Sequence, residues 1–105
     1  MITITGTILA KPETFDELLG LSIEHTQRSR KEPGCRLHSV HIDAENSLRL
    51  VFFEQWSDRP SVLAHFAEPN SRAFVARARK LAASAPIIRI YTSEEVSLGG
   101  LTGSQ

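Results

Sequence analysis

Residues 48–56 read Leu-Arg-Leu-Val-Phe-Phe-Glu-Gln-Trp, and the rest of the architecture can be worked out from this stretch. The even positions are apolar except for Glu54, as expected of a strand with one face in the core. Val51 and Phe53 make the other face apolar as well. A sheet that is apolar on both faces needs a cover on each side. We expect the chain's own helices on one side and a second copy of the chain on the other.

Three further strands are indicated by alternation of apolar and polar residues. Residues 2–10 alternate Ile with Thr, and Gly6 leaves a gap in the inner face of that strand. Residues 35–42 form a second strand that reaches 48–56 through a turn at 43–47. Pro86 precedes a last strand over 87–92.

Two helical segments lie between these strands. The first begins at Thr14, which has the spacing of a capping box with Glu17. The second is capped by Ser57 or Asp58 and is broken at Pro69, where Asn70 or Ser71 caps a further helix. The inner stripe expected for the first helix comprises Phe15, Leu18, Leu19, Ser22, Ile23 and Thr26.

The element order is strand, helix, strand, strand, helix, strand. This order is typical of an α+β fold, the ferredoxin-like split βαβ arrangement, with a four-stranded antiparallel sheet and helices on one face. Two such sheets packed face to face would form a dimeric α+β barrel. We expect a single domain over 1–93. The Gly- and Ser-rich residues 94–105 are expected to form a loose tail or to lie on a partner.

The composition excludes several classes of protein. The chain has 105 residues and a formal net charge of zero, so nothing indicates nucleic acid or an anionic membrane as a partner. No apolar run approaches the roughly 20 residues of a membrane span, and the N-terminus lacks the pattern of a signal peptide. A single cysteine, Cys35, cannot form an internal disulfide. These observations indicate a cytoplasmic protein.

Several short motifs make the chain resemble the antibiotic biosynthesis monooxygenase family, whose members are dimeric α+β barrels of about this length. The resemblance covers roughly residues 2–92. The matching motifs are Lys11-Pro12, Glu32-Pro33-Gly34-Cys35, Phe53-Glu54-Gln55-Trp56, Leu63-Ala64-His65-Phe66, and Pro69 followed at the family's spacing by Phe74.

The resemblance implies a fold more firmly than a reaction, because relatives perform different chemistry. Some oxidise quinols and polyketide anthrones without a cofactor, some degrade haem, and some isomerise a phosphorylated sugar. Haem-degrading relatives carry an asparagine and a histidine where this chain has Gly6 and Val75, so haem chemistry is disfavoured. Many relatives have Pro-His where this chain has Pro69-Asn70, and Asn70 cannot shuttle a proton.

His65 and Glu54 are the candidate catalytic residues. His65 is either a buried histidine bonded to a carbonyl or to Glu54, or a general base whose pKa suits neutral pH. Glu54 lies on the apolar parity of its strand, so a partner must offset the cost of burying its charge. It then bonds helix N–H groups or His65, or it takes part in catalysis. Trp56 is either a wall of the core or a stacking surface for a flat substrate.

A substrate pocket is expected between sheet and helices. His38 lies on the same face of its strand as Val40 and could line this pocket. Tyr91 could reach the pocket or be structural. His41 is expected at the surface or at the dimer contact. The sequence spacing of the four histidines lacks a metal-ligand pattern, so we expect no metal, and no flavin or nicotinamide motif is present. The residues expected to contact substrate are Ile4, Gly6, His38, Phe52, Trp56, Phe66, Asn70, Phe74 and Tyr91.

Three functions remain open at this point. The leading one is a cofactor-independent monooxygenase that oxidises a phenolic or quinol-type aromatic with O2, after His65 or Glu54 removes the phenolic proton. The second is an isomerase of a small polar metabolite, which would need cationic groups such as Arg36 or Arg89 in the pocket. The third is a non-catalytic module that binds a small molecule in the same pocket.

Overall fold

A computed structural model describes residues 1–103 of the chain. The elements follow one another as β1 (Ile2–Leu9), α1 (Phe15–Ser29), β2 (Cys35–Asp43), β3 (Asn46–Trp56), α2 (Arg59–Ala67), α3 (Pro69–Leu81), β4 (Ile87–Thr92) and α4 (Leu98–Leu101). The strands form one antiparallel sheet in the order β2-β3-β1-β4. The predicted ferredoxin-like α+β fold is confirmed, and the sheet is open.

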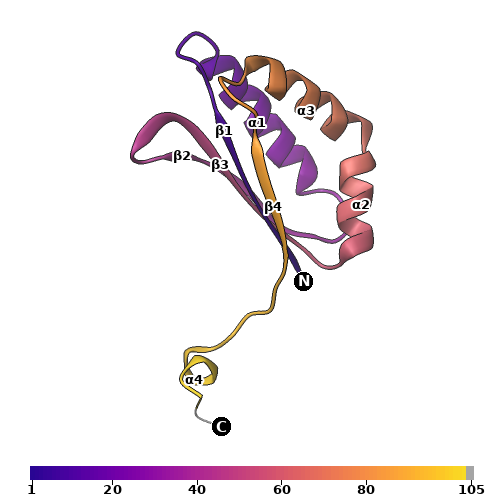
Figure 1. Cartoon of the computed structure of the whole chain (residues 1–105). Helices are drawn as coiled ribbons and strands as arrows, with labels where there is room; N and C mark the ends of the chain where they lie inside the picture. Colours follow the sequence, from indigo (N-terminus) through magenta and orange to yellow (C-terminus); the bar gives the residue numbers. More distant parts are fainter. Residues whose placement is uncertain (104–105) are drawn as a thin grey trace.

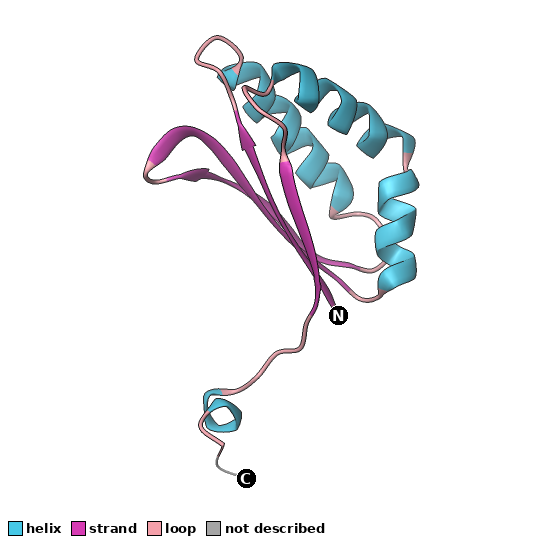
Figure 2. Ribbon diagram, in the orientation of Figure 1, coloured by secondary structure: helices cyan, strands magenta, loops and turns pink. Residues whose placement is uncertain are grey.

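The two faces of the sheet differ in what covers them. Helices α1, α2 and α3 lie against one face, and Figure 2 shows the other face without a helix. Residues Leu50, Phe52 and Trp56 of β3 face the helices and are buried, whereas the intervening Val51 and Phe53 lie on the open face and are partly exposed. The alternation read from the sequence of β3 is therefore confirmed.

The core beneath the helices falls into two apolar clusters. One joins β1 and β3 to α1 and α3, with Ile8, Leu18, Leu50, Phe52, Ala78 and Leu81 among its members. The other lies at the opposite end of the sheet and contains Ile2, Ile4, Trp56 and Val62. Glu54 lies between Phe52 and Trp56 on the same face of β3, so polar groups separate the two clusters.

The buried stripe of α1 differs from the one predicted. Leu18, Ser22 and Thr26 are buried as expected, but Ile23 is 41% exposed. The stripe continues instead through His25 and Ser29, which follow Leu18 and Ser22 at helical spacing. The prediction included the polar residues Ser22 and Thr26, but it placed Ile23 on the buried side and omitted His25 and Ser29.

The helix starts were predicted with mixed success. Thr14 occupies the N-cap of α1 but its side chain does not cap the helix, so the capping-box prediction is wrong. Its hydroxyl instead donates to the carbonyl of Leu81 at 2.7 Å and ties α1 to the end of α3. Asp58 caps α2 as predicted, accepting from the Ser61 amide at 2.9 Å. Glu68, rather than Asn70 or Ser71, caps α3.

Gly34 is required where the chain passes from α1 to β2. Its φ of +84° lies in the region that residues with a Cβ adopt at a cost. A Cβ at this position would also collide with the side chain of Ser61 at the start of α2. The turn that contains Glu32 and Gly34 can therefore approach α2 closely.

The segment after β4 leaves the body of the molecule. Figure 1 shows it running away from the sheet to the short helix α4. Leu98 and Leu101 in α4 are 78% and 74% exposed. Residues 104 and 105 of the predicted tail lie outside the described residues. None of the described helices combines the length and the apolar character needed to cross a membrane.

Candidate active site

A cavity of about 530 Å³ opens between the sheet and the helices. Its floor includes Gly6 and Phe52, and its walls include Phe66 and Phe74. A Cβ on Gly6 would meet only ordinary contacts, at 3.6 Å from the Ile87 carbonyl oxygen and 3.7 Å from the Cβ of Phe52. The absence of a side chain at Gly6 therefore leaves open volume above the sheet.

His65 lies at one end of this cavity on α2. The helix is short and buries only Val62 and His65. The imidazole lies over the indole of Trp56, with ring centroids 4.5 Å apart, and is 3% exposed. The contact with Trp56 and the low exposure place the imidazole of His65 at the boundary between the apolar core and the cavity.

Glu32 is the hydrogen-bond partner of His65. Nδ1 of His65 lies 2.9 Å from Oε1 of Glu32. A carboxylate only accepts hydrogen bonds, so Nδ1 carries the proton and donates. The second nitrogen, Nε2, is then free to act as an acceptor at the cavity. Sequence reasoning missed Glu32 because it lies after α1, in the turn before β2, and no periodicity points to it.

Glu54 is buried next to the histidines, but its hydrogen-bond partner is Trp56 rather than a helix N–H group or His65, the partners expected from the sequence. Its Oε1 accepts a hydrogen bond from Nε1 of Trp56 at 3.0 Å. The same oxygen lies 3.4 Å from Nε2 of His38 and 3.8 Å from Nε2 of His65. Burial raises the pKa of this carboxyl, and the hydrogen bond from Trp56 opposes that effect.

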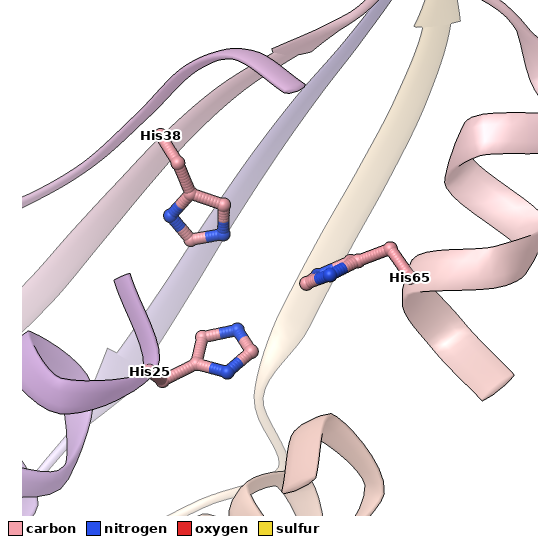
Figure 3. Close-up of side chains that lie close together, drawn as sticks. All are labelled: His25, His38 and His65. Atoms are coloured by element: carbon pink, nitrogen blue, oxygen red, sulfur yellow. The ribbon is translucent and has the colours of Figure 1, made fainter. Parts of the chain in front are cut away.

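Three of the four histidines converge at this site. His25 comes from α1, His38 from β2 and His65 from α2, and Figure 3 shows their rings facing a common space. The sequence spacing of the histidines, which lacks a metal-ligand pattern, therefore did not reveal that three of them meet in the fold. Burial, together with mutual repulsion among the imidazoles, lowers the pKa of His25 and of His38 to about 3. Both are neutral at pH 7.

The remaining predicted site residues occupy different places. Ile4, Trp56 and His38 are fully or almost fully buried and form the layer beneath the cavity surface. Asn70 is exposed at the start of α3, where its amide donates to Glu68 at 3.2 Å. Tyr91 pairs with Thr3 on the open side of the sheet.

The two arginines considered for an isomerase lie outside the cavity. Arg36 is exposed and donates to the hydroxyl of Ser57, and Arg89 is exposed in β4. Arg72 and Arg79 of α3 line the cavity instead. The cationic groups are therefore supplied by one helix, opposite the apolar floor.

The fold and the site together define a small α+β protein with a ligand-sized cavity, a buried histidine–carboxylate pair and an open sheet face. The sequence model of the antibiotic biosynthesis monooxygenase family matches residues 1–77, and the chain belongs to this family.

Comparison with individual proteins agrees with this assignment. An uncharacterized protein from Synechocystis is 34% identical over 94 residues, which are 90% of this chain and 64% of that protein. The chain thus spans less than two thirds of the length of this relative.

Solved structures are similar in fold. A Deinococcus radiodurans protein assigned to the same family has a TM-score of 0.88 at 25% identity, covering 92% of this chain and 96% of that one. Rv0793 from Mycobacterium tuberculosis has a TM-score of 0.85 at 19% identity, covering 91% and 97%. A conserved protein from Methanosarcina mazei has a TM-score of 0.84 at 24% identity, covering 89% and 92%.

Proposed function

We propose that this protein is a monooxygenase that oxidises a phenolic or quinol-type aromatic compound with O2. The observation that carries the proposal is the hydrogen bond between His65 and Glu32 beside an apolar cavity. A phenol is a weak electron donor until it loses its proton, and its anion transfers an electron to O2 far more readily. The first requirement of the reaction is therefore a base facing the aromatic ring.

His65 meets the requirements for that base. Glu32 holds the proton on Nδ1, so Nε2 presents a lone pair to the cavity. The imidazolium formed after proton transfer gains attraction from Glu32 at 2.9 Å and from Glu54 at 3.8 Å. The attraction between opposite charges is stronger at a buried site than in water.

The reaction balances without an external reductant. The phenolate gives one electron to O2, and the resulting phenoxyl radical and superoxide combine at a ring carbon that bears hydrogen. The His65 imidazolium returns its proton to the peroxide as the O–O bond breaks. One oxygen stays on carbon as a carbonyl, and the other leaves as water with two hydrogens taken from the substrate. The product is a quinone.

The cavity supports a flat aromatic substrate. Its volume of about 530 Å³ falls in the usual range for small-molecule sites. Phe52, Phe66 and Phe74 offer aromatic surfaces, and Ile88, which lies opposite Gly6 in the sheet, adds an aliphatic one. Exclusion of water from such a lining protects the radical pair until it recombines. The arginines of α3 favour a substrate that carries an anionic or strongly polar group at one end.

Oxygen consumption with a panel of quinols, naphthols and anthrones tests the proposal. His65→Ala should lower the rate by roughly 10²–10⁴-fold, the usual contribution of a general base. Glu32→Gln retains a hydrogen-bond acceptor but removes the charge, so it should also lower the rate while leaving the fold intact. His41→Ala is the matched control, because His41 lies on the exposed edge of the sheet. Activity of His65→Ala within twofold of the wild type would remove His65 from the mechanism.

We further propose that the protein is a homodimer through the open sheet face. Members of the family are commonly dimeric, and this face presents Val51 and Phe53 in its centre. Leu37 and Ile87 extend the apolar surface over β2 and β4, at 39% and 55% exposure. A second sheet packed on this open face would remove its apolar side chains from water and so stabilise the dimer.

A further inference from the structure

The rings of His25, His38 and His65 come within metal-binding reach of one another. One nitrogen from each ring lies within 4.8 Å of those of the other two. The ring centroids are 5.2–5.7 Å apart, and Figure 3 shows the three rings pointing toward one centre. The ligands come from a helix, a strand and a second helix, which is why no sequence spacing reveals them.

Three of the six ring nitrogens in this cluster are buried without a hydrogen-bond partner in the part of the chain that the structure describes. Nδ1 of His25 and both ring nitrogens of His38 are buried and unpaired among residues 1–103. His38 is 2% exposed, and the 3.4 Å approach of its Nε2 to Glu54 lacks hydrogen-bond geometry. Buried polar groups in native proteins are nearly always satisfied, so an unpaired set calls for a ligand or a functional explanation.

His65 has the outer partner expected of a metal ligand. Metal-binding histidines usually donate their other N–H to a carboxylate, which fixes the tautomer and directs the remaining lone pair at the ion. Glu32 does this for Nδ1 of His65 at 2.9 Å. Burial also keeps His25 and His38 in the neutral form that binds metal.

We propose that His25, His38 and His65 bind one divalent transition-metal ion, with a fourth coordination position open to the cavity. Three imidazoles suit Zn²⁺, Cu²⁺, Ni²⁺ and Fe²⁺. At metal–nitrogen distances of about 2.0–2.1 Å, tetrahedral ligands lie roughly 3.4 Å apart, so the nitrogens must close in by at most about 1.4 Å through side-chain rotation. The carboxylate of Glu54 offsets part of the ionic charge from beside the cluster.

Metal binding and the proposed base compete for the same atom. This step rests on the proposed function, in which Nε2 of His65 takes the substrate proton. An ion bound to Nε2 removes that lone pair. Bound Zn²⁺ should therefore stop oxygen consumption, and a chelator should restore it.

Calorimetric titration of untagged, chelator-treated protein with Zn²⁺ tests the site directly. We expect one Zn²⁺ per chain, and Co²⁺ should show the intense visible absorption of a four-coordinate ion. His41→Ala should bind like the wild type. Fewer than one Zn²⁺ in ten chains at saturation would overturn the proposal.

Variants assign the ligands. His25→Phe keeps the ring that stacks on Phe74 at 4.2 Å, and His38→Leu fills the buried space without nitrogens. Each should weaken Zn²⁺ binding at least tenfold and abolish the cobalt spectrum while circular dichroism stays unchanged. Glu32→Gln should weaken binding about 10- to 100-fold, the range for loss of an outer carboxylate. Retention of wild-type affinity by both histidine variants would refute the site.

The metal site and the proposed function can fail separately. Zn²⁺ binding is measured without substrate, so an inactive protein that binds one ion retains the metal site and loses only the oxygenase proposal. Oxygen consumption that disappears with chelator and returns with a metal ion would refute the free-base role of His65. It would leave the three-histidine site standing.

Discussion

His38→Leu should stabilise the metal-free protein at neutral pH. It should also make the free energy of unfolding depend less on pH. His38 buries two ring nitrogens without hydrogen bonds. A buried unsatisfied polar group costs about 1–3 kcal/mol. Leucine has a similar volume, and such exchanges usually cost less than about 1.5 kcal/mol in repacking. The net expectation is a gain of about 1 kcal/mol in the free energy of unfolding at pH 7.5.

The change in the free energy of unfolding with pH is a larger effect than the gain expected at pH 7.5. The pKa of His38 is about 3 in the folded protein and 6.5 in its ordinary state. Between these values the unfolded chain binds a proton that the folded protein does not, so stability is full above pH 6.5 and falls as the pH drops toward 3. At about 1.4 kcal/mol per pH unit, one such histidine removes roughly 3 kcal/mol between pH 7.5 and 4.5. His25 behaves in the same way and doubles the loss.

Urea denaturation of wild type and His38→Leu at pH 7.5, 6.0 and 4.5, in chelator, measures both quantities. The variant should lose at most half as much stability over this range, because removing His38 also relieves its repulsion of His25. A variant that is less stable than wild type at pH 7.5 and falls just as steeply would refute the reasoning. That outcome would mean that His38 is satisfied in the folded protein.

Three further changes probe the cavity, the dimer and the turn. Gly6→Phe should fill the cavity above Phe52 and abolish binding of an aromatic ligand, while the melting temperature stays close to that of wild type. Val51→Glu places an unpaired charge in the proposed interface, so sedimentation should show monomers or unfolded chains; an intact dimer would place the interface elsewhere. Gly34→Ala should lower the free energy of unfolding by about 1–3 kcal/mol through its positive φ and the collision with Ser61, and chemical denaturation reporting no loss would contradict the strain assigned to this turn.

The fold could be read from the sequence because its signals are local. Alternation along 48–56 assigned both faces of β3, and the order of strands and helices left few topologies to consider. Helix starts were less certain, since the Thr14 hydroxyl bonds to the distant Leu81 carbonyl and Glu68 is not among the residue types usually found at an N-cap.

The site could be predicted only in part. His65, Glu54 and the phenylalanines of the cavity stand in recognisable motifs or at core positions. His25 stands in no such motif, and Glu32 belongs to a family motif that did not indicate its role, because both roles arise from contacts between α1, the following turn and α2. The predicted stripe of α1 ran through Ile23, whereas the helical spacing from Leu18 and Ser22 continues on the buried side to His25.

The anchoring of α2 has a consequence for how ligands reach the cavity. The helix buries only two side chains, Val62 and His65, and His65 is the proposed base. Segments with few buried contacts open locally at a fraction of the global unfolding energy. An opening of α2 would carry His65 away from Glu32 and from the cavity. Under the proposed function, the helix whose opening would admit a ligand is therefore also the helix that assembles the base.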